Sequence, residues 1–242
     1  MKNRPLAYGL VGLALTSLPV LTSANAVEQC FAKAITQPCQ LITQAEFDKL
    51  SPDSIKAYKL KAQAKYEEAD PEDQIPAYHY CAFEPTENPN RDTPLMGLSH
   101  AMSLHISVEA FNQDQLQELP PAWQQKLQGK STKEIFNFLM EPGTRKQMML
   151  DVILQEDLSA QELEMAKAMV SQMPEPKIQP VKNLAEAGYW EVIDFGIGSQ
   201  FGHVSVLQGQ HILNIELEHG QAEEYKNWLI NLAKSIVNQC KK

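Results

Sequence analysis

The segment GIGSQFG, residues 196–202, is the first stretch whose composition could carry chemistry. Glycines let backbone N–H groups approach an anion, and Ser199 among them could serve as a nucleophile. Known phosphate loops and nucleophile elbows follow a strand and open a helix. Here the strand-like sequence HVSVLQ follows instead. We therefore predict a hairpin loop, and a hydrolase-like activity centred on Ser199 or on the histidines stays as an alternative.

The histidines raise the question of a metal site. They are His79, His100, His105, His203, His211 and His219. None forms the H-x-x-x-H spacing that places two ligands on one face of a helix. His105 and His203 both fall on the polar face of their predicted strands, and they would converge if those strands were neighbours. We predict no metal and no other cofactor, and we name these two histidines as a candidate ligand face. A metal-handling protein remains a further alternative.

Methionines and carboxylates offer two more kinds of site. The methionines of the central region are Met140, Met148, Met149, Met165, Met169 and Met173. Thioether sulfurs can bind copper, but the i, i+4 spacing of the last three favours a packed helix face or a groove for an apolar partner. The acidic run at residues 67–73 and the pair Glu216 and Glu218 lack the pattern of a calcium loop and are typical of solvated surfaces. No catalytic residue is assigned.

The first 26 residues have the three parts of a secretory signal peptide. Lys2 and Arg4 precede an apolar run over residues 6–21, and the sequence ANA at residues 24–26 supplies a cleavage site. Glycine, proline and hydroxyl residues interrupt the run, so it is a poor membrane anchor. Cleavage would leave residues 27–242 as a single soluble domain without a membrane span, in the periplasm or secreted.

Cleavage also makes the chain more acidic. The removed segment carries two basic residues and no acidic residue, so the formal net charge changes from −9 to −11. A chain this acidic is a poor partner for nucleic acid or an anionic lipid surface. The expected partner is a protein or a small apolar ligand, and the composition does not predict an oligomeric state.

Four cysteines remain after cleavage: Cys30, Cys39, Cys81 and Cys240. An even number of cysteines in an exported chain favours disulfides over metal sites or reactive thiols. A bridge between Cys30 and Cys240 would hold two chain ends that otherwise fray, and it would leave Cys39 to pair with Cys81. A bridge between Cys30 and Cys39 is the main alternative.

Helix-start patterns organise the region around the second cysteine. In QPCQLITQAEF, Thr43 and Glu46 form a capping box, which predicts a helix that begins at Gln44. A serine and a proline at residues 51–52 predict a second helix, and its composition extends it to about Ala69.

Strand patterns lie on both sides of a helical block. AYHYCAF at residues 77–83 and AMSLHISVEAF at residues 101–111 alternate between apolar and polar residues. Residues 112–172 carry almost no strand pattern and contain two further capping boxes. AGYWEVIDFG, GHVSVLQ and HILNIELEH follow as three strands, and the last two form a hairpin. An amphipathic helix is predicted over residues 221–238. The predicted fold is α+β, an antiparallel sheet of about five strands with flanking helices and a central helical insertion over about residues 109–175.

The sequence resembles an exported bacterial protein family of unknown function. The resemblance rests on PCQLITQAEF, on CAF before an alternating strand, and on NLAEAGYWE before a hairpin and a final helix with LAKSIV. The extracytoplasmic sensor domains of some receptor kinases are similar. The resemblance implies a sheet flanked by helices, a binding or accessory role rather than catalysis, and a pairing of Cys39 with Cys81. The chain departs from the family at residues 183–186 and in its long helical insertion.

Overall fold

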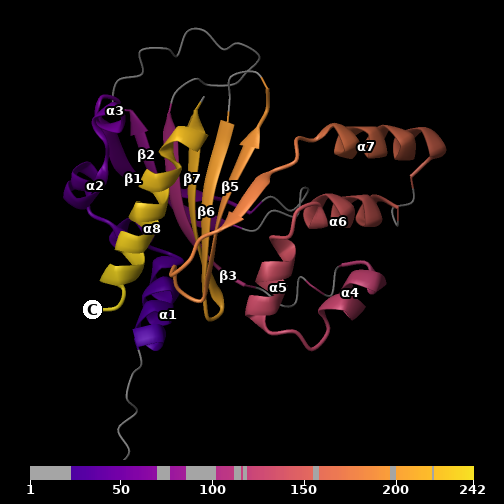
Figure 1. Ribbon diagram of the computed structural model, residues 1–242, viewed down its shortest axis with the longest axis horizontal. Coiled ribbons are helices and arrows are strands. Elements are labelled where there is room, and N and C mark those ends of the chain that lie inside the picture. Colours follow the sequence, from indigo (N-terminus) through magenta and orange to yellow (C-terminus); the bar gives the residue numbers. More distant parts are fainter. Residues whose placement is uncertain are drawn as a thin grey trace, which may run out of the picture.

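The computed structural model describes residues 23–69, 77–85, 102–111, 116, 119–154, 158–196, 200–219 and 221–242. They form one seven-stranded antiparallel sheet in the order β1-β2-β3-β7-β6-β5-β4 (Figure 1). The strands are β1 (Leu60–Glu67), β2 (Tyr78–Pro85), β3 (Ser103–Ala110), β4 (Lys177–Pro180), β5 (Ala187–Asp194), β6 (Gln200–Gln208) and β7 (His211–His219). The fold is α+β, as predicted, but the sheet has seven strands rather than about five.

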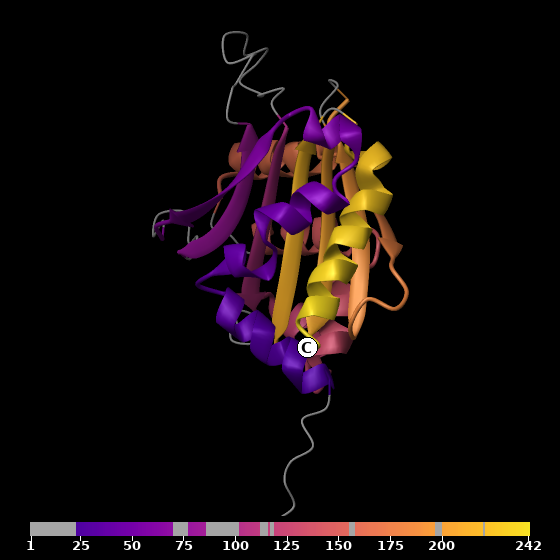
Figure 2. The same ribbon diagram turned by 90° about the vertical axis from the view of Figure 1, so that its left-hand side faces the viewer.

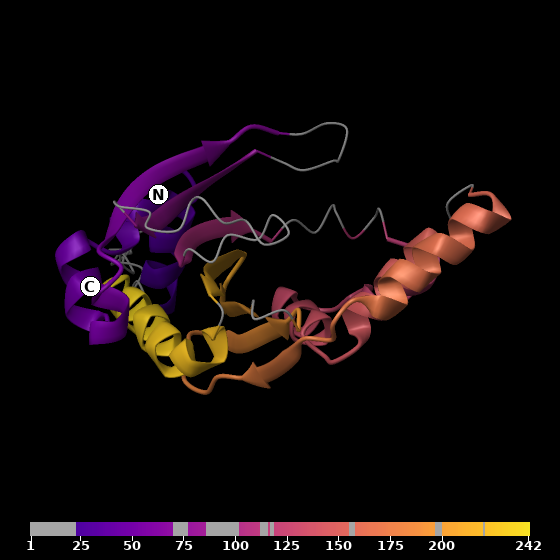
Figure 3. The same ribbon diagram turned by 90° about the horizontal axis from the view of Figure 1, so that it is seen from above.

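Helices lie on both sides of this sheet. They are α1 (Ser23–Ala34), α2 (Gln44–Leu50), α3 (Asp53–Lys56), α4 (Pro121–Leu127), α5 (Thr132–Leu139), α6 (Thr144–Ile153), α7 (Ala160–Gln172) and α8 (Lys226–Gln239), with short turns η1 (Pro38–Leu41) and η3 (Ala222–Tyr225). The helices α1, α2, α3 and α8 cover one face (Figure 2). The helices α4 to α7 connect β3 to β4 and lie on the other side, where α7 is farthest from the sheet (Figure 3). Within the described ranges, no helix is both long and apolar enough to cross a membrane.

The hydrophobic core lies between the sheet and the first group of helices. Strands β3, β6 and β7, together with Met102 just before β3, contribute alternating residues that are almost fully buried: Met102, Leu104, Ile106, Val108, Val204, Val206, Leu213, Ile215 and Leu217. The α8 helix packs Trp228, Leu229 and Leu232 against them. The alternation predicted for these strands is confirmed, because side chains at every second position point to the same face. Ser205, Asn214 and Glu216 consequently point to the opposite face.

The local start and turn patterns are also confirmed. Capping boxes with both hydrogen bonds begin α2, α5 and α7 at Thr43, Ser131 and Ser159. The β6–β7 hairpin turns at Gly209, where φ is 61°, a left-handed conformation that glycine adopts at little cost. The predicted C-terminal helix is present as η3 and α8. Local side-chain and backbone chemistry is thus sufficient to place these boundaries.

The two additional strands correct specific predictions. The helix predicted to reach Ala69 ends at Lys56, and Lys59 turns the chain with φ of 48° into β1. Helix propensity is a weak preference, and here the pairing of all eight β1 residues with β2 outweighs it. The proline-rich connector after α7 contains β4, an edge strand that ends at Pro180, a position where a missing N–H costs little.

Two disulfides join segments that are distant in sequence. Cys30 in α1 is bonded to Cys240 at the end of α8, and Cys39 in η1 is bonded to Cys81 in β2. The predicted pairing is confirmed, and the alternative bridge between Cys30 and Cys39 is wrong. Residues 1–22 of the predicted signal peptide lie outside the described residues, and its predicted cleavage site falls within α1.

Candidate functional site

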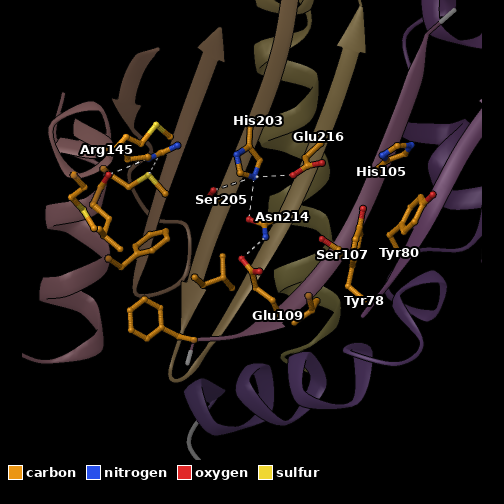
Figure 4. A pocket seen from close by; sticks show the side chains of 18 of the residues that line it. Tyr78, Tyr80, His105, Ser107, Glu109, Arg145, His203, Ser205, Asn214 and Glu216 are labelled. Atoms are coloured by element: carbon orange, nitrogen blue, oxygen red, sulfur yellow. Dashed lines mark hydrogen bonds and ion pairs between the residues drawn. The ribbon is translucent and has the colours of Figure 1, made fainter. Parts of the chain in front are cut away.

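A pocket of about 890 Å³ lies between the face of the sheet opposite the core and the helices α5, α6 and α7 (Figure 4). Strands β2, β3, β6 and β7 form one wall with mostly polar side chains. The helices form the other wall, whose apolar side chains are Phe136, Leu139, Met140, Met148, Met149, Val152, Ile153 and Val170. The pocket therefore offers a ligand two surfaces of different chemistry.

The register of the sheet arranges the polar wall in rows. His105 of β3 and His203 of β6 are each directly opposite Glu216 of β7, and Glu191 of β5 is opposite His203. The next row on the same face consists of Tyr80, Ser107, Asn214, Ser205 and Tyr189. Adjacent strands are about 4.8 Å apart, so each row brings side chains of separate segments within reach of one another.

His105 and His203, the candidate ligand face of the sequence, both line the pocket. They do not converge, because β7 lies between β3 and β6 and separates the two strands by about 10 Å. The histidines instead face Glu216 from its two sides (Figure 4). Glu216 was predicted to be a solvated carboxylate, yet its side chain is only 35% exposed. Among the described residues, no group of three His, Cys, Asp or Glu side chains could hold a metal ion.

A hydrogen-bond chain fixes the tautomer of His203. Asn214 donates from Nδ2 to Oε1 of Glu109 at 2.9 Å, which leaves its Oδ1 facing Nε2 of His203 at 3.0 Å. An amide oxygen only accepts, so Nε2 of His203 carries the proton. The hydroxyl of Ser205 lies 3.2 Å from the same nitrogen. Since that nitrogen already donates, it is not a base that could activate Ser205.

Burial shifts the titration of the central groups in opposite directions. It lowers the pKa of His203, while the carboxylate of Glu191, 4.0 Å from Nδ1, acts in the opposite direction. Burial raises the pKa of Glu216, and the nearby carboxylate of Glu109 adds to this shift. Neutral His203 is therefore the dominant form at pH 7, so it does not compensate the charge of Glu216.

An ion pair connects the helical wall to the sheet. Arg145 of α6 donates from Nη1 and Nη2 to the two carboxylate oxygens of Glu191 at 3.0 and 2.7 Å. Its Nε donates to the carbonyl oxygen of Leu139 at 3.2 Å, and Nη2 contacts Sδ of Met140 at 2.9 Å. The Glu191 side chain is 4% exposed, whereas that of Arg145 is 38% exposed. This bidentate pair holds α6 against β5 and so maintains the shape of the pocket.

Aromatic side chains from β2 and β3 occupy the other end of the polar wall. The ring of Tyr80 lies 4.8 Å from that of His105 and 5.5 Å from that of Tyr78. The Tyr80 hydroxyl donates to Oε1 of Glu67 at 3.0 Å. Burial, followed by the interaction with Glu67, raises the pKa of Tyr78 to about 12. Tyr78 and Tyr80 are therefore uncharged at neutral pH, and they line the same pocket as Glu109 and Glu216.

The remaining sequence candidates lie apart from this centre. Met140, Met148 and Met149 line the pocket, but Met165, Met169 and Met173 are 61%, 65% and 47% exposed. The predicted packed helix face is wrong for these three residues, because α7 contacts α6 and buries only Val170. The alternative, a groove for an apolar partner, stays a prediction. Ser199 and His100 lie outside the described residues. Strands β5 and β6 pair as the predicted hairpin requires, and β6 includes the last three residues of the glycine segment, residues 200–202.

Several pocket residues were not singled out from the sequence. Ser107 and Glu109 follow His105 at intervals of two residues, so strand alternation alone places them on the same face. Arg145 and Glu191 carry no comparable pattern, because they are 46 residues apart and meet only in the folded chain. No family model matches the chain, and no curated protein or solved structure matches it significantly.

The lowered pKa of His203 predicts a specific pH dependence. Unfolded histidine takes up a proton below about pH 6.5, whereas folded His203 resists protonation, so this group stabilises the fold above pH 6.5 and that contribution is lost as the pH falls. We expect His203→Gln, which retains a donor toward Asn214, to lose less stability than the wild type between pH 7 and about pH 5. Urea denaturation at several pH values measures the difference.

The matched control for this experiment is His79→Gln. His79 lies on β2, which β3 and β7 separate from β6, and it does not belong to the hydrogen-bond chain of His203. Equal pH dependence in the wild type and His203→Gln would show that His203 is not the group responsible. Glu191, Glu216 and Arg145 also face this histidine, so the comparison is made between variants that retain all three.

Proposed function

We propose that this chain is an extracytoplasmic, periplasmic or secreted, binding or accessory protein that holds a small, partly apolar ligand without transforming it. The observation that carries the proposal is the pocket of about 890 Å³ with one apolar and one polar wall. Ligand pockets have volumes of about 300–1,000 Å³ and combine apolar surfaces with a few placed polar groups. The signal-peptide pattern and the two disulfides support a location outside the cytoplasm.

Two observations support binding rather than catalysis. The hydrogen-bond chain through Asn214 directs the proton of His203 toward the amide oxygen, so Ser205 has no base at that nitrogen. Four of the five N–H donors of Arg145 are engaged with Glu191, Leu139 and Met140, so little of its guanidinium is left to polarise a substrate. The resemblance to exported proteins with a sensor-like fold leads to the same expectation.

Filling the pocket tests this function. Ser107 lies on β3 and lines the pocket, whereas Ser103 lies on the same strand and the same face but does not line it. We expect Ser107→Trp to weaken binding of N-phenyl-1-naphthylamine, a neutral fluorescent reporter, by about tenfold or more, because the indole occupies the ligand volume. Ser103→Trp should leave the affinity within about twofold of the wild type. A fluorescence titration of the three proteins measures these affinities.

Two results would contradict the proposed function. One is the absence of saturable reporter binding to the wild type. The other is the same affinity in Ser107→Trp and Ser103→Trp, which would place the reporter elsewhere. The catalytic alternative is tested separately with nitrophenyl esters, where hydrolysis that disappears in Ser205→Ala would show that the site is an enzyme site after all.

A further inference from the structure

We propose that the pocket selects amphipathic cations: an organic ammonium group lies at Glu216 and Glu109, and its apolar portion packs against α5, α6 and α7. This inference rests on the proposed function and adds the charge of the ligand to it. Three observations carry it: the balance of charge on the pocket wall, the aromatic rings beside the carboxylates, and the apolar helices opposite them.

The charge on the pocket wall is unbalanced. Glu109, Arg145 and Glu216 are the acidic and strongly basic side chains among the described residues that line the pocket. Arg145 is neutralised by the buried carboxylate of Glu191, to which it donates two hydrogen bonds. Among the described residues, Glu109 accepts from the neutral amide of Asn214, and no Lys or Arg forms an ion pair with Glu109 or Glu216. Two carboxylates therefore face the pocket, and no cation of the described residues pairs with either.

His203 does not supply the missing charge. Its Nε2 lies 4.0 Å from Oε1 of Glu216, but burial lowers the pKa of His203 and keeps the ring neutral at pH 7. Burial also raises the pKa of the Glu216 carboxyl, so the ionised form of Glu216 is unfavourable when no cation lies beside it. A bound cation would restore the interactions that burial removes, whereas a bound anion would add to the repulsion.

Aromatic rings lie next to the carboxylates. The side chains of Tyr78 and Tyr80 lie on one side of Glu216 and Arg145 lies on the other (Figure 4). The charge of Glu216 contributes to the raised pKa of Tyr78, so the two groups are close enough to interact. Aromatic faces attract organic cations through the negative potential above the ring, and sites for quaternary ammonium groups combine such faces with acidic side chains. This end of the pocket has both components.

The opposite wall suits an apolar ligand portion. Methionines and branched aliphatic residues from α6, among them Met148, Met149 and Val152, line it. Methionine side chains adapt to apolar groups of different shapes. A hydrocarbon chain or ring system attached to the ammonium group would contact this wall while its charge remained at Glu216. A simple metal cation or a small free amine would leave the wall unused.

Competition with the neutral reporter tests the inference. Octyltrimethylammonium, octyl glucoside and octyl sulfate have the same tail and positive, neutral and negative heads. We expect octyltrimethylammonium to displace N-phenyl-1-naphthylamine at about tenfold lower concentration than octyl glucoside, and octyl sulfate to be the weakest competitor. In Glu216→Gln, and likewise in Glu109→Gln, the preference for the cation should fall to about twofold or less.

Glu218→Gln is the matched control, because Glu218 is on the same strand and face as Glu216 but does not line the pocket. It should retain the wild-type preference. Equal displacement by the three amphiphiles, or an unchanged preference in Glu216→Gln with the reporter still bound, overturns the charge selectivity and leaves the proposed function intact. If neither the reporter nor any amphiphile binds the wild type, the proposed function itself fails. Reporter binding to each variant shows that the variant is folded.

Discussion

Replacing Cys30 and Cys240 together with alanine is expected to produce the largest loss of stability of any two-residue change considered for this chain. The bridge connects residues 210 positions apart. In the chain-entropy model, removing a disulfide that closes a loop of this length lowers the free energy of unfolding by about 5 kcal/mol. Measured losses for native disulfides are about 2–5 kcal/mol. The unfolded chain gains freedom, while the folded chain loses the covalent link between α1 and α8.

The position of the bridge explains why its loss also affects the fold locally. The α1 helix packs against β3, β6 and β7, and α8 packs against β6, so both helices cover the same part of the sheet. Without the link, α1 is held by noncovalent contacts alone, and terminal helices fray readily. We expect Cys30→Ala/Cys240→Ala to unfold at lower urea concentration and α1 amides to exchange faster.

Urea denaturation without reductant measures this effect. The matched control is Cys39→Ala/Cys81→Ala, whose bridge spans 42 residues and is worth about 4 kcal/mol in the same model. Wild-type protein in reductant should be destabilised more than either double variant, because both bridges open. If Cys30→Ala/Cys240→Ala unfolds at the wild-type midpoint, the terminal bridge does not stabilise the fold.

Arg145→Met is expected to lower the free energy of unfolding by about 3 kcal/mol at neutral pH, because it leaves Glu191 as a buried charge without a partner. The Glu191 side chain is only 4% exposed, so water cannot replace the guanidinium. Urea denaturation at neutral pH measures this loss.

A double-variant cycle separates charge from packing. Arg145→Met/Glu191→Gln removes the cation and the buried charge together, and we expect it to recover most of the stability lost in Arg145→Met. Glu191→Gln alone should be milder, since Arg145 is 38% exposed and remains hydrated. If the double variant is as unstable as Arg145→Met, the contacts of Arg145 with Leu139 and Met140, rather than its charge, hold α6 in place.

Only part of the candidate site could be predicted from the sequence. Strand alternation placed His105 and His203 on polar faces, and the same alternation contains Ser107, Asn214, Ser205 and Glu216. It could not show that these faces are covered, because a period of two identifies a face and not what lies against it. Ser205 and Asn214 are in fact 3% and 8% exposed.

The methionines show the converse: an apolar face that the spacing identified is exposed. The spacing of Met165, Met169 and Met173 identifies one helix face, and the sequence favoured a packed face or a groove for an apolar partner. The structure leaves these side chains exposed, because α7 contacts α6 and buries only Val170. The periodicity therefore identified the helix but could not show what contacts its faces, because that depends on where the whole helical block lies.

The sequence by itself determined the helix starts at Thr43, Ser131 and Ser159 and the alternation of β3, β6 and β7. Its even number of cysteines also indicated two disulfides. Each of these depends on residues a few positions apart or on a simple count. Only the tertiary structure decided that residues 60–67 form a strand, that β7 separates the two histidines, and that Arg145 meets Glu191 to close the pocket. The physical reason is that strand pairing and buried ion pairing depend on packing and desolvation between segments that are distant in the sequence. A local pattern carries no information on either.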